Sequence, residues 1–258
     1  ASNIESIVGV GGDDTVTLGA AITAASIDLG SGTDQLNLAD GTNAVTVTAV
    51  ETINGNSGSD TVTLGAAQAG GNIDLGAGTA DRLNLVGAGN TLTVSGTESL
   101  SGSTGDDIIT LGAGISAANV DLGAGTGDTL NLSVENHNLT VSNVETITGD
   151  VGDDAIVFST VVTSGVYDLG VGADQVTLNN GTAANTITVS NVESFTGSSA
   201  ADSVTFGAAI ASGTVNLGAG ADSLTLGNGT NVLTVTSAES MTGNAGADTI
   251  TLGGAMTA

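Results

Sequence analysis

The sequence contains no cysteine, proline, lysine or tryptophan, and its 258 residues include one arginine, one histidine, one tyrosine and three phenylalanines. Without cysteine there can be no disulfide, no thiolate metal ligand and no thiol nucleophile. A single arginine offers no basic patch for a phosphate backbone, so we expect no nucleic-acid partner. No apolar run reaches the roughly 18 to 20 residues of a membrane helix, so we expect no membrane insertion.

Glycine and acidic residues are abundant instead. The chain has 41 Gly and 27 Asp and Glu, which gives a formal net charge of −26, and 40% of it is hydrophobic. That apolar content is too high for a disordered acidic tail. Many small aliphatic residues with few aromatic ones favour a thin, regular core. The excess negative charge must be spread out or neutralised from outside the chain.

The sequence repeats with a period of about 47 residues. A Glu followed by Ser or Thr and then an apolar residue recurs at spacings of 46, 47, 47, 48 and 46 residues. These glutamates are Glu5, Glu51, Glu98, Glu145, Glu193 and Glu239. We therefore expect a single continuous solenoid over residues 1–258, with about five and a half repeats that begin near these positions.

Each repeat alternates short β-type runs with glycine-rich turns. In the second repeat the apolar centres of the runs are Ile53, Val62, Ile73, Leu83 and Leu92. Such short strands cannot bury a face alone, so they must stack on their neighbours. Alternation in residues 61–64 (TVTL) directs Val62 and Leu64 inward and the two threonines outward. The pattern predicts an all-β fold, a right-handed parallel β-roll or β-solenoid, whereas a β-sandwich would need longer strands and bulkier core residues.

Two kinds of turn end in aspartate. The first follows G-x-x-G-x-D at residues 9–14, 55–60, 102–107, 149–154 and 243–248, while residues 197–202 (GSSAAD) lack the second glycine. The second follows an IDL-type strand, as in residues 29–34 (LGSGTD), and two copies carry an extra residue. Glycine permits positive φ and lets carbonyl oxygens converge, and Asp adds the hard anionic oxygen that Ca²⁺ selects. The predicted ligands are Asp14, Asp34, Asp60, Asp81, Asp107, Asp128, Asp154, Asp174, Asp202, Asp222 and Asp248.

Further metal contacts are predicted beside these aspartates. Four aspartates precede a Leu-Gly pair, namely Asp28, Asp74, Asp121 and Asp168. The turn glycines expected at the metal are Gly9, Gly30, Gly32, Gly55, Gly58, Gly102, Gly105, Gly149, Gly152, Gly243 and Gly246.

The number of strands per repeat predicts how the acidic turns stack. Five strand-and-turn units make about two and a half turns of a roll, so every second turn falls on the same edge. The turns that contain Asp60, Asp81 and Glu98 should then lie next to one another, ~4.8 Å apart. The next repeat should place its trio on the opposite edge. Carboxylates this close repel, so either their pKa values rise or a divalent cation lies between them.

These Asp-ended turns, in phase with the strand period, resemble the RTX family, whose nonapeptide G-G-x-G-x-D-x-U-x builds a calcium-binding parallel β-roll. The continuations after Asp34 (QLNL) and Asp60 (TVTL) resemble the family too, although the leading glycine pair is usually degraded. The interleaved T-V-x-x-x-E segments are similar to repeat regions of bacterial surface-layer proteins and large adhesins. The resemblance implies several Ca²⁺ ions and a secreted, extracellular, cell-surface protein exported by type I secretion.

The leading hypothesis is a calcium-folded structural protein of the bacterial exterior. We expect it to associate with copies of itself, end to end or laterally, in a surface layer, filament or matrix, or to be a segment of a large adhesin; cell-surface polysaccharide is a second candidate partner. No enzyme is expected, because the acid pairs at residues 106–107 and 153–154 recur as turn motifs and form no unique site.

The alternative to this structural role is an ice- or glycan-binding solenoid that uses outward Thr rows such as Thr61 and Thr63. A metal-independent amyloid-like matrix is a third option.

Overall fold

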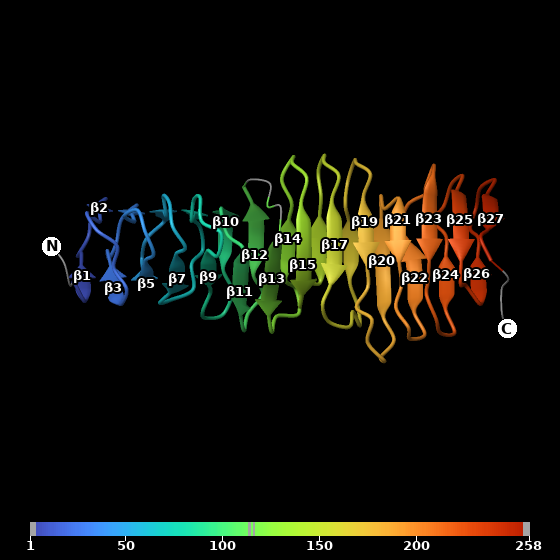
Figure 1. Ribbon diagram of the computed structural model, residues 1–258, viewed down its shortest axis with the longest axis horizontal. Coiled ribbons are helices and arrows are strands. Elements are labelled where there is room, and N and C mark those ends of the chain that lie inside the picture. The colour runs from blue at the N-terminus through green and yellow to red at the C-terminus, as the bar shows by residue number, and fades with distance from the viewer. Residues whose placement is uncertain (1–3, 113–114, 116, 255–258) are drawn as a thin grey trace. The chain divides into compact units, whose positions relative to one another are not determined.

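The computed structural model describes residues 4–112, 115 and 117–254, and the two ends of the predicted range 1–258 lie outside them. The described residues form short β-strands, and none of them belongs to a helix that could span a membrane (Figure 1). The chain divides into two compact units, Ala1–Asn131 and Leu132–Ala258. In each unit parallel strands pair into two sheets, and the chain passes from one sheet to the other after every strand.

In the first unit the two sheets contain alternate strands. One sheet consists of β1 (Ser6–Val8), β3 (Ala25–Asp28), β5 (Ala44–Thr48), β7 (Thr61–Leu64), β9 (Arg82–Asn84), β11 (Ser99–Ser103) and β13 (Ala118–Gly123). The other consists of β2 (Thr15–Thr17), β4 (Gln35–Asn37), β6 (Thr52–Asn54), β8 (Asn72–Asp74), β10 (Thr91–Ser95), β12 (Ile108–Leu111) and β14 (Thr129–Asn131). Each strand pairs with the strand two places later, so that Ile7 lies opposite Ile27 and Val62 opposite Leu83.

The second unit has the same organisation. One sheet consists of β15 (Asn138–Ser142), β17 (Ala155–Phe158), β19 (Gln175–Thr177), β21 (Ser194–Thr196), β23 (Gly213–Asn216), β25 (Val232–Thr236) and β27 (Thr249–Leu252). The other consists of β16 (Thr146–Thr148), β18 (Val166–Asp168), β20 (Thr186–Ser190), β22 (Ser203–Phe206), β24 (Ser223–Thr225) and β26 (Ser240–Thr242). One coil takes about 20 residues, and the predicted all-β parallel solenoid is confirmed.

The core of each unit lies between its two sheets and is mostly aliphatic. In β7, Val62 and Leu64 are 0% and 1% exposed, while the threonines on either side of Val62 face outward, as predicted. Full burial of such a side chain stabilises the fold by roughly 1.5–3 kcal/mol. Large aromatic side chains enter the core of the second unit, where the Phe158 and Tyr167 ring centroids are 4.8 Å apart. The buried Tyr167 hydroxyl donates a hydrogen bond to the Val144 carbonyl over 2.7 Å.

Successive repeats begin in alternate sheets, because each repeat supplies five strands. The strand after Glu51 is β6, which belongs to the even-numbered sheet, and the strand after Glu98 is β11, which belongs to the odd-numbered sheet. The first Asp turn of the second repeat therefore crosses one edge of the solenoid, and that of the third repeat crosses the other. The predicted alternation of edges is confirmed.

Candidate functional site

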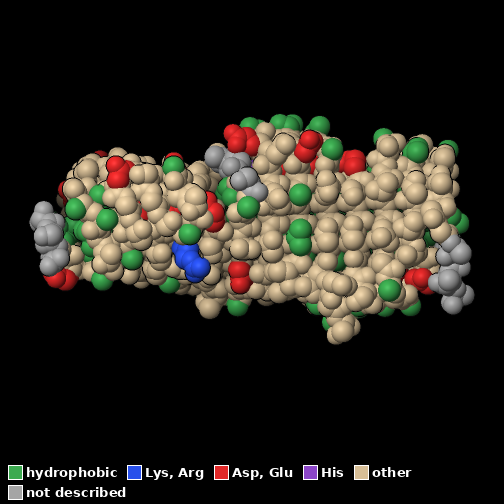
Figure 2. Space-filling model, viewed as in Figure 1, with side chains coloured by type: hydrophobic (Ala, Val, Ile, Leu, Met, Phe, Trp, Pro, Cys, Tyr) green, Lys and Arg blue, Asp and Glu red, His purple; other side chains and the backbone are tan. Residues whose placement is uncertain are grey.

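The aspartates that end the turns point into the solenoid. The nine turn-ending aspartates between Asp34 and Asp222 have side chains that are at most 1% exposed. The first and last turn-ending aspartates, Asp14 and Asp248, are half-buried. On the face shown in Figure 2, acidic side chains appear only as scattered groups, although the chain has 27 acids. Nine of the turn aspartates are thus enclosed at the edges of the core.

In the second repeat the three predicted acidic residues form one stack. The backbone N–H of Asp60 donates to Oδ1 of Asp81 over 2.6 Å, and the N–H of Asp81 donates to Oε2 of Glu98 over 2.8 Å. The same bonds link the trios Asp14–Asp34–Glu51, Asp154–Asp174–Glu193 and Asp202–Asp222–Glu239. The extra residue before Asp128 is accommodated, because the N–H of Asp107 donates to its Oδ1 over 2.6 Å.

The residue that precedes the aspartates in most stacks is not among the predicted ligands. It is an asparagine 17 residues before the first Asp, and its backbone N–H and Nδ2 both donate to Oδ1 of that Asp. These residues are Asn43, Asn90, Asn185 and Asn231. Before the stack of the fourth repeat His137 takes this place, and its N–H donates to Oδ1 of Asp154 over 2.9 Å. The constant offset of 17 residues was the signal that could have found them.

The second carboxylate oxygen lacks a partner in many of these stacks. The Oδ2 atoms of Asp34, Asp60, Asp81, Asp154, Asp174 and Asp222 are buried and have no hydrogen-bond partner among the described residues. An unsatisfied buried acceptor costs about 1–3 kcal/mol, and more when it is charged. Either a proton or a cation can compensate such an oxygen.

Burial changes the acidity of these groups. Burial, followed by the charges of Asp154 and Glu193, raises the pKa of Asp174 from 3.8 to about 6. Burial also raises the pKa values of Asp60, Asp81, Asp154 and Asp222. For Asp81 and Asp222 the neighbouring carboxylates of the stack act in the same direction, so the fold favours the neutral form.

The turn glycines let adjacent coils approach closely. A Cβ at Gly9, Gly55, Gly102 or Gly149 would lie 2.0–2.3 Å from the carbonyl oxygen of a leucine in the adjacent coil. A Cβ at Gly32 would lie 2.1 Å from the Gly12 carbonyl oxygen and 3.1 Å from Oδ1 of Asp34. No side chain fits between these oxygens, so the close approach of the coils requires glycine at this position. Gly172 has the same surroundings, with the Gly152 oxygen at 1.9 Å and Oδ1 of Asp174 at 2.8 Å from the Cβ position.

The other predicted glycines also lie at close approaches or special turns. A Cβ would come within 3 Å of the backbone of another coil at Gly30, Gly58, Gly105, Gly152 and Gly246. At Gly243 it would meet only Oδ2 of Asp248, at 3.2 Å. The glycines therefore shape the turns around the aspartates, and their part in holding a metal stays a prediction.

The four aspartates before Leu-Gly pairs lie outside the stacks. They are exposed, and Oδ1 of each accepts a hydrogen bond from the N–H of the glycine two residues later. These are Asp28, Asp74, Asp121 and Asp168. Asn216 makes the same bond to Gly218 in the fifth repeat, so this turn does not require a carboxylate.

A cation in the stacks would need backbone oxygens as ligands. Within the part of the chain that the structure describes, no three His, Cys, Asp or Glu side chains form a group that could hold a metal ion. Calcium accepts backbone carbonyls together with carboxylates. Carbonyl oxygens of the turns, together with the unpaired Oδ2 atoms, are the donor set that the stacks offer to such a cation.

Comparison with known families identifies the repeats. The model of the RTX calcium-binding nonapeptide repeat matches residues 49–67, 93–114, 214–235 and 236–255. The chain contains RTX-type repeats. The matched segments include the turns that end in Asp60, Asp107, Asp222 and Asp248, so the resemblance noted in the sequence is confirmed on these RTX turns. No curated protein and no solved structure matches the chain.

Proposed function

We propose that the chain is a calcium-binding structural solenoid that folds on meeting calcium outside the cell. The observation that carries this proposal is the set of buried carboxylate oxygens with no partner among the described residues. The chain has 27 acidic residues and a single basic one besides its histidine, so it has almost no cation of its own to offer them. The RTX-type turns identify calcium as the cation to test.

Six aspartates would contribute to the calcium sites through Oδ2. They are Asp34, Asp60, Asp81, Asp154, Asp174 and Asp222. Carbonyl oxygens of the surrounding glycine-rich turns would complete the coordination. Bound calcium supplies positive charge and oxygen coordination, and the residues of the turn position the oxygens and exclude bulky side chains.

Calcium binding would be coupled to folding. Before folding, the negative charges repel and keep the chain expanded. A preformed site rarely exists in an unfolded chain, so the binding free energy contributes directly to folding. This behaviour would suit a secreted protein that stays unfolded where calcium is scarce, and an extracellular, cell-surface location reached by type I secretion is part of the proposal.

Far-UV circular dichroism of the full chain in EDTA, followed by calcium titration, tests the proposal. We expect a disordered spectrum that becomes β-type with calcium, while magnesium at equal concentration has a much smaller effect. Magnesium is the matched control because it demands near-octahedral geometry and dehydrates reluctantly. An unchanged β spectrum in EDTA, with no calcium bound in equilibrium dialysis, would refute calcium-coupled folding.

We also propose a structural role with self-association rather than catalysis. The only histidine, His137, is 1% exposed and takes part in a stack, which leaves it unsuited to proton transfer with a substrate. A surface layer, a filament or an adhesin segment would all use the folded solenoid as a repeated building unit. Sedimentation velocity in calcium over a range of protein concentrations tests self-association, and a constant monomer value would contradict it.

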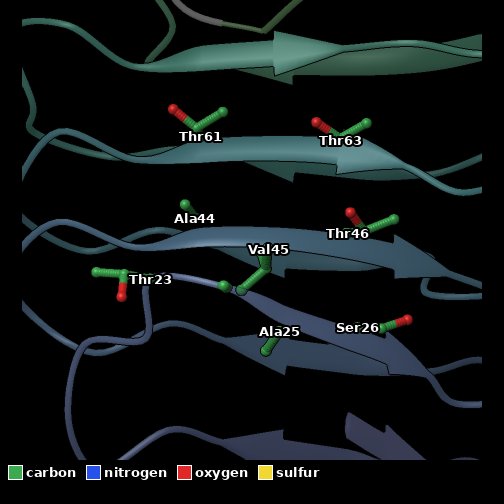
Figure 3. A pocket seen from close by; sticks show the side chains of 9 residues that line it. Thr23, Ala25, Ser26, Ala44, Val45, Thr46, Thr61 and Thr63 are labelled. Carbon is green, nitrogen blue, oxygen red and sulfur yellow. The ribbon is translucent and has the colours of Figure 1, made fainter. Parts of the chain in front are cut away.

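A second candidate function rests on hydroxyl rows on the outer sheet faces. In the second unit Thr188, Thr205, Thr225 and Thr242 lie opposite one another across β20, β22, β24 and β26. Figure 3 shows a related groove in the first unit, where Thr46, Thr61 and Thr63 lie on the same side of β5 and β7. Such a regular face fits ice or a flat glycan surface.

Replacement of Thr205 by isosteric Val tests this second candidate. The variant should reduce thermal hysteresis if the face binds ice, or retention on insoluble polysaccharide if it binds glycan. Thr15→Val in the first unit is the matched control. Wild-type protein with neither activity would exclude this candidate.

A further inference from the structure

Two turn aspartates have both carboxylate oxygens satisfied by the protein itself. Oδ2 of Asp107 accepts hydrogen bonds from the backbone N–H of Ser103 over 3.0 Å and from its hydroxyl over 3.1 Å. Oδ2 of Asp202 accepts the same pair of bonds from Ser198, over 2.8 and 2.9 Å. Both aspartates are at most 1% exposed. In each case the serine is the second residue of the six-residue turn that ends in the aspartate.

Asp60 is the matched case without a serine. Asp60 and Asp107 each accept two hydrogen bonds from an asparagine one coil earlier, and each donates its N–H to the next aspartate over 2.6 Å. The second residue of the Asp60 turn is Asn56, whose Nδ2 donates to the Leu38 carbonyl instead. Oδ2 of Asp60 is left without a partner among the described residues. The second residue of the turn therefore decides whether the carboxylate is satisfied.

The turn backbone differs in the same way. The fourth turn residue has positive φ in the turns without serine, as at Gly58 with 114°. In the two serine turns this position, Gly105 or Ala200, is not among the residues with positive φ. Because positive φ is not needed there, Ala200 is tolerated, and its N–H donates to the Ser198 hydroxyl over 3.1 Å. The missing second glycine of residues 197–202 thus accompanies a serine that binds the aspartate directly.

We propose that Ser103 and Ser198 take the place of calcium at Asp107 and Asp202. These two turns stay free of metal, while turns with an unpaired buried Oδ2 hold the ion. The inference rests on the proposed calcium function, because it states which of the Asp-ended turns bind calcium and which do not. A carboxylate whose oxygens already accept N–H and O–H hydrogen bonds must lose them to ligate calcium, so it gains little from the ion.

Asp60→Asn and Asp107→Asn in the full chain test the inference as a matched pair. Equilibrium dialysis with calcium counts bound ions, and titration with trimethylamine N-oxide in EDTA measures folding without calcium, since this osmolyte favours the compact state. D60N should bind at least one calcium ion fewer than wild type, and in EDTA it should fold at the same or lower osmolyte concentration. D107N should keep the wild-type calcium count, and in EDTA it should need more osmolyte because Ser103 loses its acceptor.

Ser103→Ala supplies a variant that leaves the carboxylate in place. We expect Ser103→Ala to weaken folding in EDTA. Ser199→Ala is the control, because it removes an exposed hydroxyl from the residue that follows Ser198, and it should have little effect. Loss of a calcium ion in D107N equal to that in D60N would overturn the inference and leave calcium binding intact. Absence of calcium binding in wild type would instead overturn the proposed function, and the osmolyte comparison would still test whether serine satisfies Asp107.

Discussion

Removing the charge of Asp174 should stabilise the calcium-free protein at neutral pH. Asp174 is 0% exposed, and its pKa of about 6 in the folded state compares with an ordinary value of 3.8. One pKa unit corresponds to about 1.4 kcal/mol, so ionisation of Asp174 costs the folded state about 3 kcal/mol. Asp174→Asn retains an oxygen that accepts the Asp154 N–H and removes the buried charge.

The size of this effect depends on pH in a defined direction. The folded state holds the Asp174 proton more tightly than the unfolded state, so it binds more protons between about pH 4 and 6. The free energy of unfolding therefore falls as pH rises through this window, and the full cost is present above about pH 6. Burial lowers the pKa of His137 from 6.5, so this residue acts in the opposite direction and destabilises the fold as pH falls below 6.5. The difference between D174N and wild type removes the His137 contribution.

Folding in EDTA at pH 4, 5, 6 and 7, driven by sucrose and followed by circular dichroism, measures this difference, because this osmolyte carries no titratable group in the range. D174N and wild type should agree near pH 4, and D174N should be more stable by about 3 kcal/mol at pH 7. Asp168→Asn is the control, because Asp168 is exposed and Asn216 already fills the equivalent position. A difference that does not change with pH, or a D174N variant less stable at pH 7, would refute the reasoning.

Three further predictions concern the protein folded in calcium, and urea unfolding measures each. Leu83→Ala, at a side chain that is 0% exposed, should lower the free energy of unfolding by about 2–5 kcal/mol, and a loss below about 1 kcal/mol would contradict a tightly packed core. Gly55→Ala places a Cβ 2.2 Å from a backbone oxygen and should destabilise the fold, whereas Gly19→Ala has nothing within 4 Å; equal effects would refute the close approach of the coils. Tyr167→Phe should cost about 1 kcal/mol through loss of its buried hydrogen bond, and no change would show that this bond contributes nothing.

The stack of Asp60, Asp81 and Glu98 could be predicted from the sequence because it depends only on counting. A parallel solenoid repeats its register from coil to coil, so five strands per repeat determine which turns share an edge. Alternation within residues 61–64 determined the inward side chains for the same reason. Both predictions needed the spacing of apolar residues and no knowledge of the turn conformation.

The hydrogen bonds inside the stacks could not be predicted in this way. The N–H of Asp60 meets Oδ1 of Asp81, 21 residues away, only once the two coils are in register. Grouping acids by their place in the repeat put Asp28 beside the turn aspartates, whereas the fold places it on the surface, where its Oδ1 accepts the N–H of Gly30; its part in holding a metal stays a prediction. Asn43 was overlooked because an uncharged residue carries no obvious chemistry until its partner Asp60 is seen.

The two oxygens of a turn carboxylate explain how one motif can serve both structure and binding. Oδ1 accepts a backbone N–H from the preceding coil, which holds adjacent coils in register whether or not a metal is present. Oδ2 is the atom that differs between turns, since Ser103 satisfies it at Asp107 whereas no described residue does so at Asp60. Under the proposal made above, a turn would gain or lose a requirement for calcium through its second residue, while the register of the solenoid is kept. This separation predicts that metal dependence varies from turn to turn within a single regular fold.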